Sequence, residues 1–215
     1  MHKIAPYIDH TILKPDTNSE QIQQLCQEAL TYSFAAVCVP PYFVALASSI
    51  LEKSNVKVAT VIGFPFGYSS IAAKVEEAKR AIQDGAVELD VVVNIAAIKD
   101  ARWNYVQNEL DILTTTCHLQ DKKIKIIFET SLLSEAEILK LCQISTDIGA
   151  DFIKTSTGFN GGGASVEVVQ LMKNNIPNTI KIKASGGIRT LSEAESMITA
   201  GADRIGTSSA VTMIQ

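Results

Sequence analysis

Lys154 stands at the end of a short apolar run and is followed by three hydroxyl-bearing residues and a glycine. A run of this kind predicts a buried strand, and burial disfavours the ammonium form of a lysine because the charge loses its water. A free lysine has a pKa near 10.4, so a lysine nucleophile at neutral pH needs a lowered pKa. Lys154 is therefore a candidate nucleophile. The alternative is a lysine whose stem is buried while its head reaches solvent.

A second lysine, Lys183, follows in the next apolar run, just before a pair of glycines. Neighbouring strands would bring its ammonium group close to Lys154, and a like charge nearby lowers a lysine pKa. Lys181 shares a strand face with Lys183, but Lys183 lies closer to the glycine turn, which favours it. Asp90 interrupts an earlier apolar run and could pair with either lysine or relay protons. Together these residues favour catalysis over a purely structural network of ion pairs.

Two glycine-containing loops near the end of the sequence predict a site for an anion. They contribute Gly186, Gly187, Ile188 and Arg189 from the first loop and Gly206, Ser208 and Ser209 from the second. Glycines let backbone N–H groups approach an anion, and a helix that starts after such a loop adds the positive end of its dipole. A third glycine-rich stretch, 158–163, is expected to be a flexible loop that closes over a ligand or merely connects two elements.

Strands and helices alternate along the chain in a way that would bring these residues to one face. The predicted strands are 8–13, 35–39, 57–63, 86–93, 123–129, 151–154, 180–184 and 203–205. The predicted helices are 19–32 with Ser19 as N-cap, 43–53, 70–84, 105–118, 135–148, 165–174, 192–200 and a short last helix opened by Ser208 or Ser209. Eight strand–helix units predict a (β/α)₈ barrel with a short N-terminal extension, whose site lies at the C-terminal ends of the strands. A doubly wound open sheet is the alternative, although no G-x-G-x-x-G motif follows the first strand.

The composition indicates one globular domain over residues 1–215. Hydrophobic residues make up 47% of the 215 residues, and the formal net charge is −4. With no basic stripe and no long apolar run, nucleic acid and membranes are not expected as partners. The four cysteines are widely spaced, which is typical of reduced thiols in a cytoplasmic protein, and the three histidines are too scattered for a predicted metal site.

The same motifs carry a resemblance to the deoxyribose-phosphate aldolase family. The matching strings are IDHT from residue 8, VCVPP from 37, VIGFPFG from 61, ELDVV from 88, FIKTSTG from 152, KASGGIRT from 183 and GTSS from 206. The match runs in order through nearly the whole chain. It implies a class I aldolase on a (β/α)₈ barrel, without a cofactor, that reversibly cleaves 2-deoxy-D-ribose 5-phosphate to D-glyceraldehyde 3-phosphate and acetaldehyde.

The resemblance also implies a role for each matching residue. Lys154 would form the Schiff base, Lys183 would lower its pKa, and Asp90 would relay protons. Asp9, Thr11, Cys38 and Thr155 would contact the substrate. The phosphate would be bound by Gly158 and by the two loops that contain Gly186, Gly187, Ile188, Arg189, Gly206, Ser208 and Ser209. The expected partners are a small phosphorylated sugar and short aldehydes, and the expected assembly is a homodimer or homotetramer.

The sequence departs from some family members at two places. Phe159 stands where some relatives have a lysine, and no tyrosine lies beyond Tyr105, whereas some relatives carry one near the C-terminus. The first departure predicts the loss of one phosphate contact. For the second there are two expectations: slower turnover, if protonation of the acetaldehyde enamine needs that tyrosine, or water acting in its place. Two other functions remain open from the sequence: a Schiff-base aldolase for another phosphorylated sugar, and a non-catalytic barrel that binds a phosphosugar.

Overall fold

A computed structural model describes residues 2–215 and contains a closed barrel of eight parallel strands, β1 to β8 in chain order. The strands are β1 Ile8–Thr11, β2 Ala36–Val39, β3 Lys57–Ile62, β4 Glu88–Val92, β5 Lys123–Ile127, β6 Phe152–Lys154, β7 Lys181–Ser185 and β8 Arg204–Thr207. Closure is direct, because β1 pairs with β8 as well as with β2. The predicted (β/α)₈ barrel is confirmed, and Met1 of the predicted domain lies outside the described residues.

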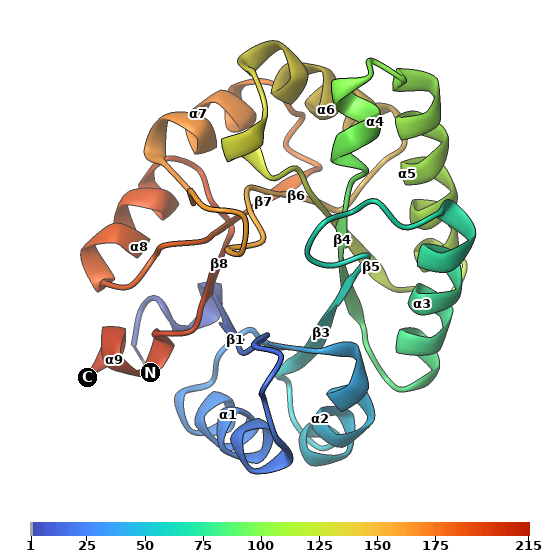
Figure 1. Ribbon diagram of the computed structural model, residues 1–215. Coiled ribbons are helices and arrows are strands. Elements are labelled where there is room, and N and C mark those ends of the chain that lie inside the picture. The colour runs from blue at the N-terminus through green and yellow to red at the C-terminus, as the bar shows by residue number, and fades with distance from the viewer. Residues whose placement is uncertain (1) are drawn as a thin grey trace.

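Helices surround the barrel, and the two ends of the chain lie near each other beside α9 (Figure 1). The helices are α1 Ser19–Tyr32, α2 Val44–Leu51, α3 Ile71–Gln83, α4 Ile95–Lys99, α5 Trp103–His118, α6 Glu135–Asp147, α7 Val166–Asn174, α8 Leu191–Thr199 and α9 Ala210–Ile214. Short 3₁₀ segments occupy Ala5–Tyr7, Pro41–Phe43 and Thr130–Leu132. The first of these forms the short N-terminal extension.

Side-chain caps explain where several helices start. Asn18 and Gln21 form a reciprocal capping box at α1, so the N-cap is Asn18 and the prediction of Ser19 is wrong by one residue. The same arrangement joins Ser134 to Glu137 at α6. Each box satisfies backbone N–H groups that the first helical turn leaves without a partner.

Most of the apolar core lies between the strands and the helices, and the centre of the barrel is different. Alternate strand residues point inward, and several inward positions carry buried acidic or basic side chains in place of branched apolar ones. A small apolar group of Cys38, Ala59 and Val61 also lies apart from the main core, with Leu13 and Phe64 packed against it. The interior of the barrel is therefore built to hold charge.

The end of β4 is fixed by a buried ion pair between α3 and α5. Lys74 of α3 donates to Glu109 of α5 at 2.8 Å and to the carbonyl oxygen of Val92 at 2.7 Å. The other oxygen of Glu109 accepts the backbone N–H of Asn94 at 2.9 Å. Removing one partner of such a pair leaves an uncompensated buried charge, which is strongly destabilising. These contacts tie two outer helices to the strand that carries Asp90.

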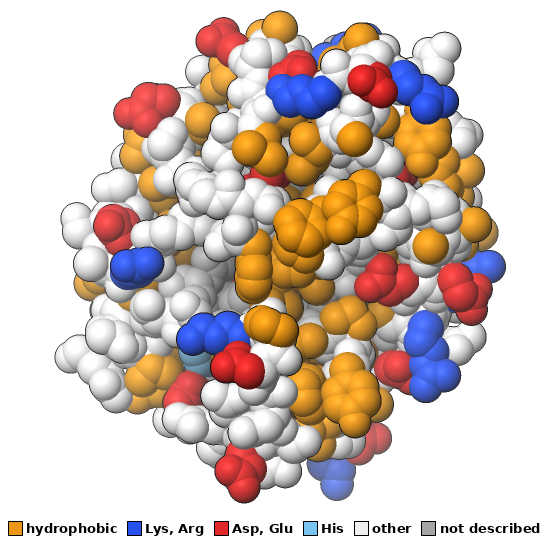
Figure 2. All heavy atoms as spheres, in the orientation of Figure 1, with side chains coloured by type: hydrophobic (Ala, Val, Ile, Leu, Met, Phe, Trp, Pro, Cys, Tyr) orange, Lys and Arg blue, Asp and Glu red, His pale blue; other side chains and the backbone are white. Residues whose placement is uncertain are grey.

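Aromatic side chains gather around the loop that follows β3. Phe66 and Tyr68 stack with their ring centroids 5.4 Å apart, and Phe64 meets Phe159 edge to face at 5.2 Å. Figure 2 shows apolar side chains across the middle of the face presented in Figure 1.

Among residues 2–215, no helix is long and apolar enough to cross a membrane.

Candidate active site

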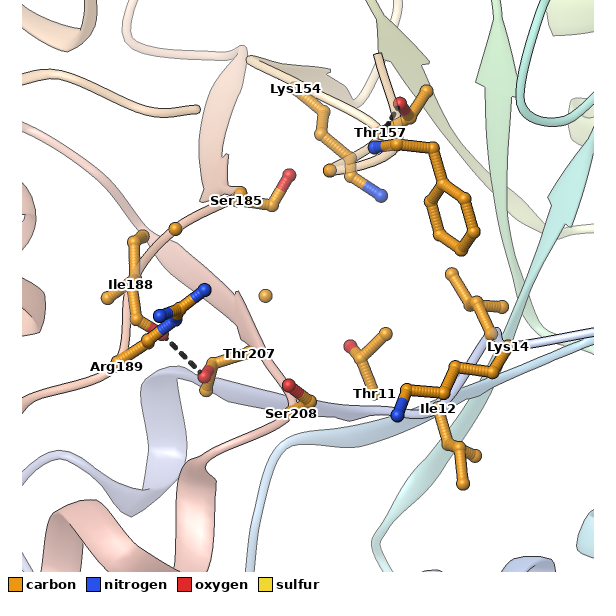
Figure 3. Close-up of a pocket in the computed structure, with 16 residues that line it drawn as sticks. Thr11, Ile12, Lys14, Lys154, Thr157, Ser185, Ile188, Arg189, Thr207 and Ser208 are labelled. Atoms are coloured by element: carbon orange, nitrogen blue, oxygen red, sulfur yellow. Dashed lines mark hydrogen bonds between the residues drawn. The ribbon is translucent and has the colours of Figure 1, made fainter. Parts of the chain in front are cut away.

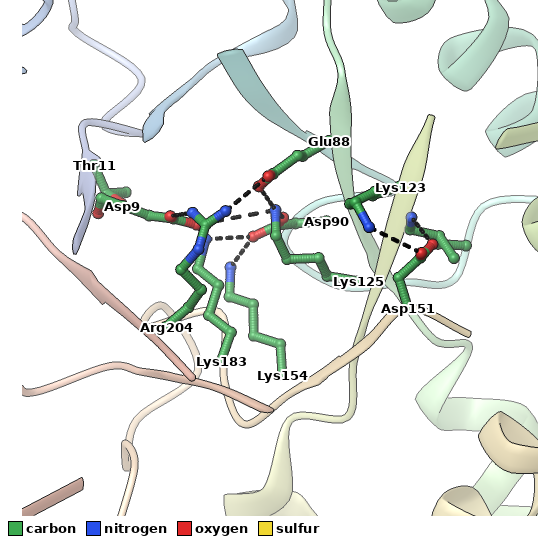
Figure 4. Close-up of polar contacts among 11 residues, drawn as sticks. Asp9, Thr11, Glu88, Asp90, Lys123, Lys125, Asp151, Lys154, Lys183 and Arg204 are labelled. Atoms are coloured by element: carbon green, nitrogen blue, oxygen red, sulfur yellow. Dashed lines mark hydrogen bonds and ion pairs between the residues drawn. The ribbon is translucent and has the colours of Figure 1, made fainter. Parts of the chain in front are cut away.

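Seven charged side chains meet inside the barrel and form one connected cluster (Figure 4). The acidic members are Asp9, Glu88 and Asp90, and the basic members are Lys125, Lys154, Lys183 and Arg204. They come from β1, β4, β5, β6, β7 and β8. Buried charges are tolerated when they are paired and hydrogen-bonded, as they are here.

Lys154 ends β6 and is 3% exposed. Its Nζ donates to Asp90 at 2.8 Å, and it lines the cavity described below. Burial lowers the pKa of Lys154 below the ordinary value, and the nearby Lys183 ammonium adds to this, while the negative charge of Asp90 opposes it. The outcome is an amine that loses its proton more readily than a free lysine, as a Schiff-base lysine requires.

Lys183 pairs with Lys154 in the strand register, but its pKa is shifted in the opposite direction. Burial disfavours its charge, yet contacts with both Asp9 and Asp90 raise the pKa of Lys183 above the ordinary range. Lys183 therefore stays protonated and acts on Lys154 as a fixed positive charge. Lys181, the alternative left open by the sequence, is exposed near the Phe152 ring at the start of β7.

Asp90 and Asp9 stay ionised in spite of burial. For Asp90, burial alone would raise the pKa, but Lys125, Lys154 and Lys183 hold it well below the usual range. For Asp9, the same opposition between burial and the cations Lys183, Arg204 and Lys125 leaves a pKa of about 2. Both side chains are therefore hydrogen-bond acceptors at neutral pH.

The formal charges of the cluster balance when Lys154 is neutral. The carboxylates of Asp9, Glu88 and Asp90 then face three cations, namely Lys125, Lys183 and Arg204. Lys154 has one carboxylate partner, Asp90, and shares it with Lys125 and Lys183. Of the four basic side chains, Lys154 is therefore the one whose positive charge is least stabilised by neighbouring carboxylates.

Three members of this cluster were not predicted from the sequence, namely Glu88, Lys125 and Arg204. Lys125 donates to Asp90 at 2.7 Å and lies 2.8 Å from Glu88, and Arg204 donates to Glu88 at 2.8 Å and also contacts Asp9. A signal was present for Glu88, because it lies two residues before Asp90 and must share its inward face. Lys125 likewise occupies an alternate position inside an apolar strand.

A cavity of about 450 Å³ opens next to Lys154 (Figure 3). Of the predicted site residues, it is lined by Thr11, Lys154, Gly158, Gly186, Gly187, Ile188, Arg189, Gly206 and Ser208. Residues that were not predicted and also line it include Ile12, Leu13, Lys14, Thr157, Ser185 and Thr207. Thr11, at the end of β1, turns its hydroxyl to the carbonyl oxygen of Asp9 at 2.9 Å.

The remaining predicted residues lie outside the cavity lining, which comprises none of Asp9, Cys38, Asp90, Thr155, Lys183 and Ser209. Asp9, Asp90 and Lys183 form the ion cluster behind Lys154. Cys38 is buried, and burial raises the pKa of its thiol. The Thr155 hydroxyl donates to the carbonyl oxygen of Ser185 and accepts its N–H, both at 3.0 Å. Thr155 thus joins β6 to β7.

Two strand ends differ from the prediction. Lys183 lies in the middle of β7, and Gly206 lies inside β8, because Ser185 and Gly206 still pair in register. Gly206 leaves room there, since a Cβ at this position would come within 3.0 Å of the Lys183 side chain. The glycine of the second loop therefore accommodates Lys183 as well as lining the cavity.

The loops after β7 and β8 are tied together beside the cavity. Gly186 and Gly187 have φ values of +90° and +77°, a conformation that glycine adopts without strain. Thr207 donates its hydroxyl to the carbonyl oxygen of Ile188 at 2.8 Å and accepts the N–H of Ser209 at 3.0 Å. The two loops therefore present backbone and hydroxyl groups in a fixed arrangement, as an anion cradle requires.

The glycine-rich loop 158–163 is anchored, contrary to the expected flexible loop. Asn160 donates to Glu129 at 2.8 Å and to the carbonyl oxygen of Pro65 at 3.3 Å, and Ser131 donates to that of Gly161 at 3.1 Å. Glu129 is fully buried and also accepts the N–H and hydroxyl of Thr157. These contacts hold the segment that follows Lys154.

Phe159, the site of one departure, lines the cavity next to this loop and is 47% exposed. Its ring packs edge to face on Phe64 from the β3 loop.

In the described part of the chain, His, Cys, Asp and Glu side chains form no group of three that could hold a metal ion.

Comparisons with known proteins identify the family of this chain. Residues 3–212 match the DeoC/LacD family aldolase. The chain is 51% identical to the deoxyribose-phosphate aldolase of Thermococcus kodakarensis over 99% of this chain and 96% of the relative, and 49% identical to that of Staphylococcus epidermidis over 98% and 95%.

Solved structures give the same result. An aldolase called QR15 superposes with a TM-score of 0.94 at 45% identity, covering 100% of this chain and 95% of the other. A deoxyribose phosphate aldolase from Aeropyrum pernix, described as having a unique tetrameric structure, superposes with a TM-score of 0.92 at 34% identity, covering 98% and 89%. The match over residues 3–212, the relatives of about 50% identity and the shared barrel show that this chain belongs to the DeoC/LacD family of aldolases.

Proposed function

We propose that this protein is a class I aldolase that reversibly cleaves 2-deoxy-D-ribose 5-phosphate to D-glyceraldehyde 3-phosphate and acetaldehyde. The observation that carries the proposal is Lys154, a buried lysine with a lowered pKa that opens onto a cavity of about 450 Å³. The full-length similarity to deoxyribose-phosphate aldolases supports this choice of sugar.

The first chemical step joins Lys154 to the substrate. The neutral amine attacks the C1 aldehyde of the open-chain sugar, and the adduct loses water to give a protonated imine. Asp90, 2.8 Å from Nζ, accepts the proton that the attacking nitrogen gives up. Lys183 contacts the same Asp90 oxygen at 2.9 Å and keeps a positive charge beside it, so the proton is readily returned.

The imine then acts as an electron sink. The C3 hydroxyl loses its proton to water in the cavity, the bond between C2 and C3 breaks, and its electrons move toward the imine nitrogen. This releases glyceraldehyde 3-phosphate and leaves a two-carbon enamine on Lys154. Protonation at C2 and hydrolysis by water release acetaldehyde and restore the amine. These reaction steps involve no metal or redox cofactor.

The far end of the cavity suits the 5-phosphate. Gly158, Gly186, Gly187, Ile188, Gly206 and Ser208 would surround it with backbone N–H groups and a hydroxyl, and Arg189 would add a positive charge. In this assignment Asp9 positions Lys183, and Thr155 fixes β6 against β7. Thr11 borders the sugar together with Leu13, which packs against the buried Cys38. Ser209 holds the loop after β8 through its N–H.

A substrate panel tests the proposal. Purified protein is incubated with 2-deoxyribose 5-phosphate, with 2-deoxyribose and with a phosphorylated six-carbon ketose, and aldehyde release is followed by reduction with alcohol dehydrogenase. We expect cleavage of the first at the highest kcat/KM and loss of all cleavage in Lys154→Met. Preference for the six-carbon sugar would reassign the substrate, and cleavage by Lys154→Met at the wild-type rate would remove the mechanism.

We further propose a homodimer or homotetramer of one-domain subunits in a reducing, cytoplasmic setting. The tetrameric relative supports assembly, and the four buried, unpaired cysteines suit a reducing compartment. Light scattering coupled to size-exclusion chromatography measures the mass directly. A monomer at micromolar concentration would contradict the assembly.

A further inference from the structure

We propose that Lys14 is a phosphate-binding residue, whose ammonium group acts with Arg189 to select phosphorylated substrates. The inference rests on the aldolase function proposed above and concerns the specificity of the same cavity. Lys14 follows β1 by three residues, in the loop that leads to α1. Its neighbours Ile12 and Leu13 also line the cavity.

The position of Lys14 places a positive charge beside Ser208 of the second glycine loop and across the cavity from Arg189 of the first (Figure 3). Lys14, Arg189 and Ser208 all line the cavity next to Lys154. In Figure 3 the Lys14 side chain extends along the cavity edge with its ammonium end on the side of Thr11 and Ser208, and Arg189 lies across from it. A dianion held by the glycine loops would therefore lie between two cationic side chains.

The other loops around the cavity leave a need for this charge. The loop after β6 contributes the apolar ring of Phe159. The one further basic side chain lining the cavity, among residues 2–215, is Lys154, which has to be neutral to react. The chain as a whole carries a net charge of −4, so its overall field does not attract a phosphate. Local cations must compensate for the loss of water around a phosphate dianion.

Lys14 is available for such a contact. It is exposed, and no carboxylate within the described residues lies in ion-pair distance of it. Glu28 lines a neighbouring hollow that Lys14 also borders, but its oxygens are taken by His10 at 2.7 Å and Gln24 at 2.8 Å. The Lys14 carbonyl oxygen accepts the hydroxyl of Thr17 at 2.7 Å and its N–H at 3.2 Å, so the backbone is held in place.

The test is a comparison of Lys14→Met with wild type on phosphorylated and unphosphorylated substrate. We expect KM for 2-deoxyribose 5-phosphate to rise about five- to tenfold, an effect between an exposed ion pair and a buried charge-assisted contact. The inhibition constant of inorganic phosphate should rise by a similar factor. The kcat value, and kcat/KM for 2-deoxyribose, should stay within about twofold, because neither involves the phosphate charge.

Two further variants serve as controls. Lys14→Arg keeps the positive charge and should restore KM to near the wild-type value. Lys53→Met removes the same charge from an exposed lysine after the end of α2, away from the cavity lining, and should change nothing. An unchanged KM in Lys14→Met, or an equal loss on both substrates, would overturn the inference.

Direct phosphate binding separates this inference from the proposed function. Inorganic phosphate is titrated into wild type and Lys14→Met in a calorimeter, with no reaction required. Weaker binding in Lys14→Met supports the role of Lys14 even if the wild type fails to cleave 2-deoxyribose 5-phosphate, and in that case the proposed reaction alone is wrong. Equal binding by the two proteins contradicts the role of Lys14 whatever the activity.

Discussion

Lys154 and Lys183 are the same residue type, pair in register on neighbouring strands, and yet have opposite pKa shifts. Both are buried, so desolvation favours the neutral amine in each. The difference lies in their partners, because Lys183 contacts two carboxylates whereas Lys154 shares one with two other lysines. One strand position thus holds an amine with a lowered pKa, and its neighbour holds an amine with a raised pKa.

This division predicts different stability effects for the two lysines. Lys154→Met should change the free energy of unfolding by about 1 kcal/mol or less, since a single hydrogen bond is lost and the cluster stays balanced. Lys183→Met should cost about 3–5 kcal/mol, because Asp9 loses a buried partner. Urea unfolding at pH 7 measures both. Equal losses in the two variants would contradict the assignment of charge.

The lowered pKa of Lys154 predicts how imine formation depends on pH. The reacting form is the neutral amine, so the rate of trapping with acetaldehyde should rise with pH and level off above the pKa of Lys154. Because burial and Lys183 lower this pKa, the midpoint should lie below the ordinary value of 10.5. Stopped-flow trapping across a pH series measures it. A midpoint at or above 10.5 would show that the amine is not activated.

The sequence reveals part of this chemistry at the residue scale. Lys154, Lys183 and Asp90 stand out because a charge in an apolar strand has few uses other than pairing or catalysis. Lys125 and Arg204 were not predicted because a single basic residue in a short strand usually reaches solvent. The direction of each pKa shift depends on which carboxylate oxygens each nitrogen meets, and only the folded barrel determines that.

At the scale of elements, the loops after β6 and β7 form one unit beside the cavity. The N–H of Ala164 donates to the carbonyl oxygen of Gly186 at 3.1 Å, and a Cβ on Gly163 would come within 2.4 Å of that oxygen. Gly163 therefore sets how closely the segment after Lys154 approaches the predicted phosphate loop. Its role is steric, since its backbone does not need positive φ.

Gly163→Ala should separate these loops and weaken phosphate recognition. We expect KM for 2-deoxyribose 5-phosphate to rise by about tenfold or more, corresponding to roughly 1.4 kcal/mol or more. Gly161→Ala is the matched control in the same loop: its φ of +74° makes alanine strained, but a Cβ there meets nothing within 4 Å. Its effect should fall mainly on stability. A larger rise in KM for Gly161→Ala would contradict the steric role of Gly163.

The sequence predicts the eight strand–helix units, and the differences are local. The observed strand ends differ from the predicted ones by one or two residues, because backbone pairing, as between Ser185 and Gly206, determines where a strand ends. The helix Ile95–Lys99 was missed because five residues show too little periodicity, although Asn94 caps it. The loop 158–163 was expected to be flexible from its glycines, but its anchors, Glu129 and Ser131, come from a different part of the chain.

For the whole molecule, the barrel closes around charge and so should be sensitive to acid. Asp9 joins β1 to Lys183 of β7 and Arg204 of β8, where the barrel closes. Its pKa falls from 3.8 in the unfolded chain to about 2 in the fold. A lowered carboxyl pKa stabilises the fold above the unfolded value, and that contribution is lost as pH falls through the folded value.

Asp9 should therefore contribute about 2 kcal/mol at neutral pH, lost between pH 4 and pH 2. Urea unfolding from pH 7 to pH 2 should show stability falling in this window. Asp9→Asn should be less stable at pH 7, because Lys183 and Arg204 lose their charged partner, and its stability should fall less steeply below pH 4. A slope identical to that of wild type would rule out Asp9 as a main acid-sensitive group.

The central claim is that Lys154 forms the Schiff base, and reductive trapping tests it most directly. Wild-type protein is treated with acetaldehyde and sodium borohydride, digested, and mapped by mass spectrometry, with Lys154→Met treated in parallel. We predict an ethyl adduct on Lys154 in close to stoichiometric amount, inactivation that follows its formation, and no adduct at another buried lysine in Lys154→Met. An inactivating adduct on Lys125 or Lys183, or full activity after Lys154 is modified, would contradict the account.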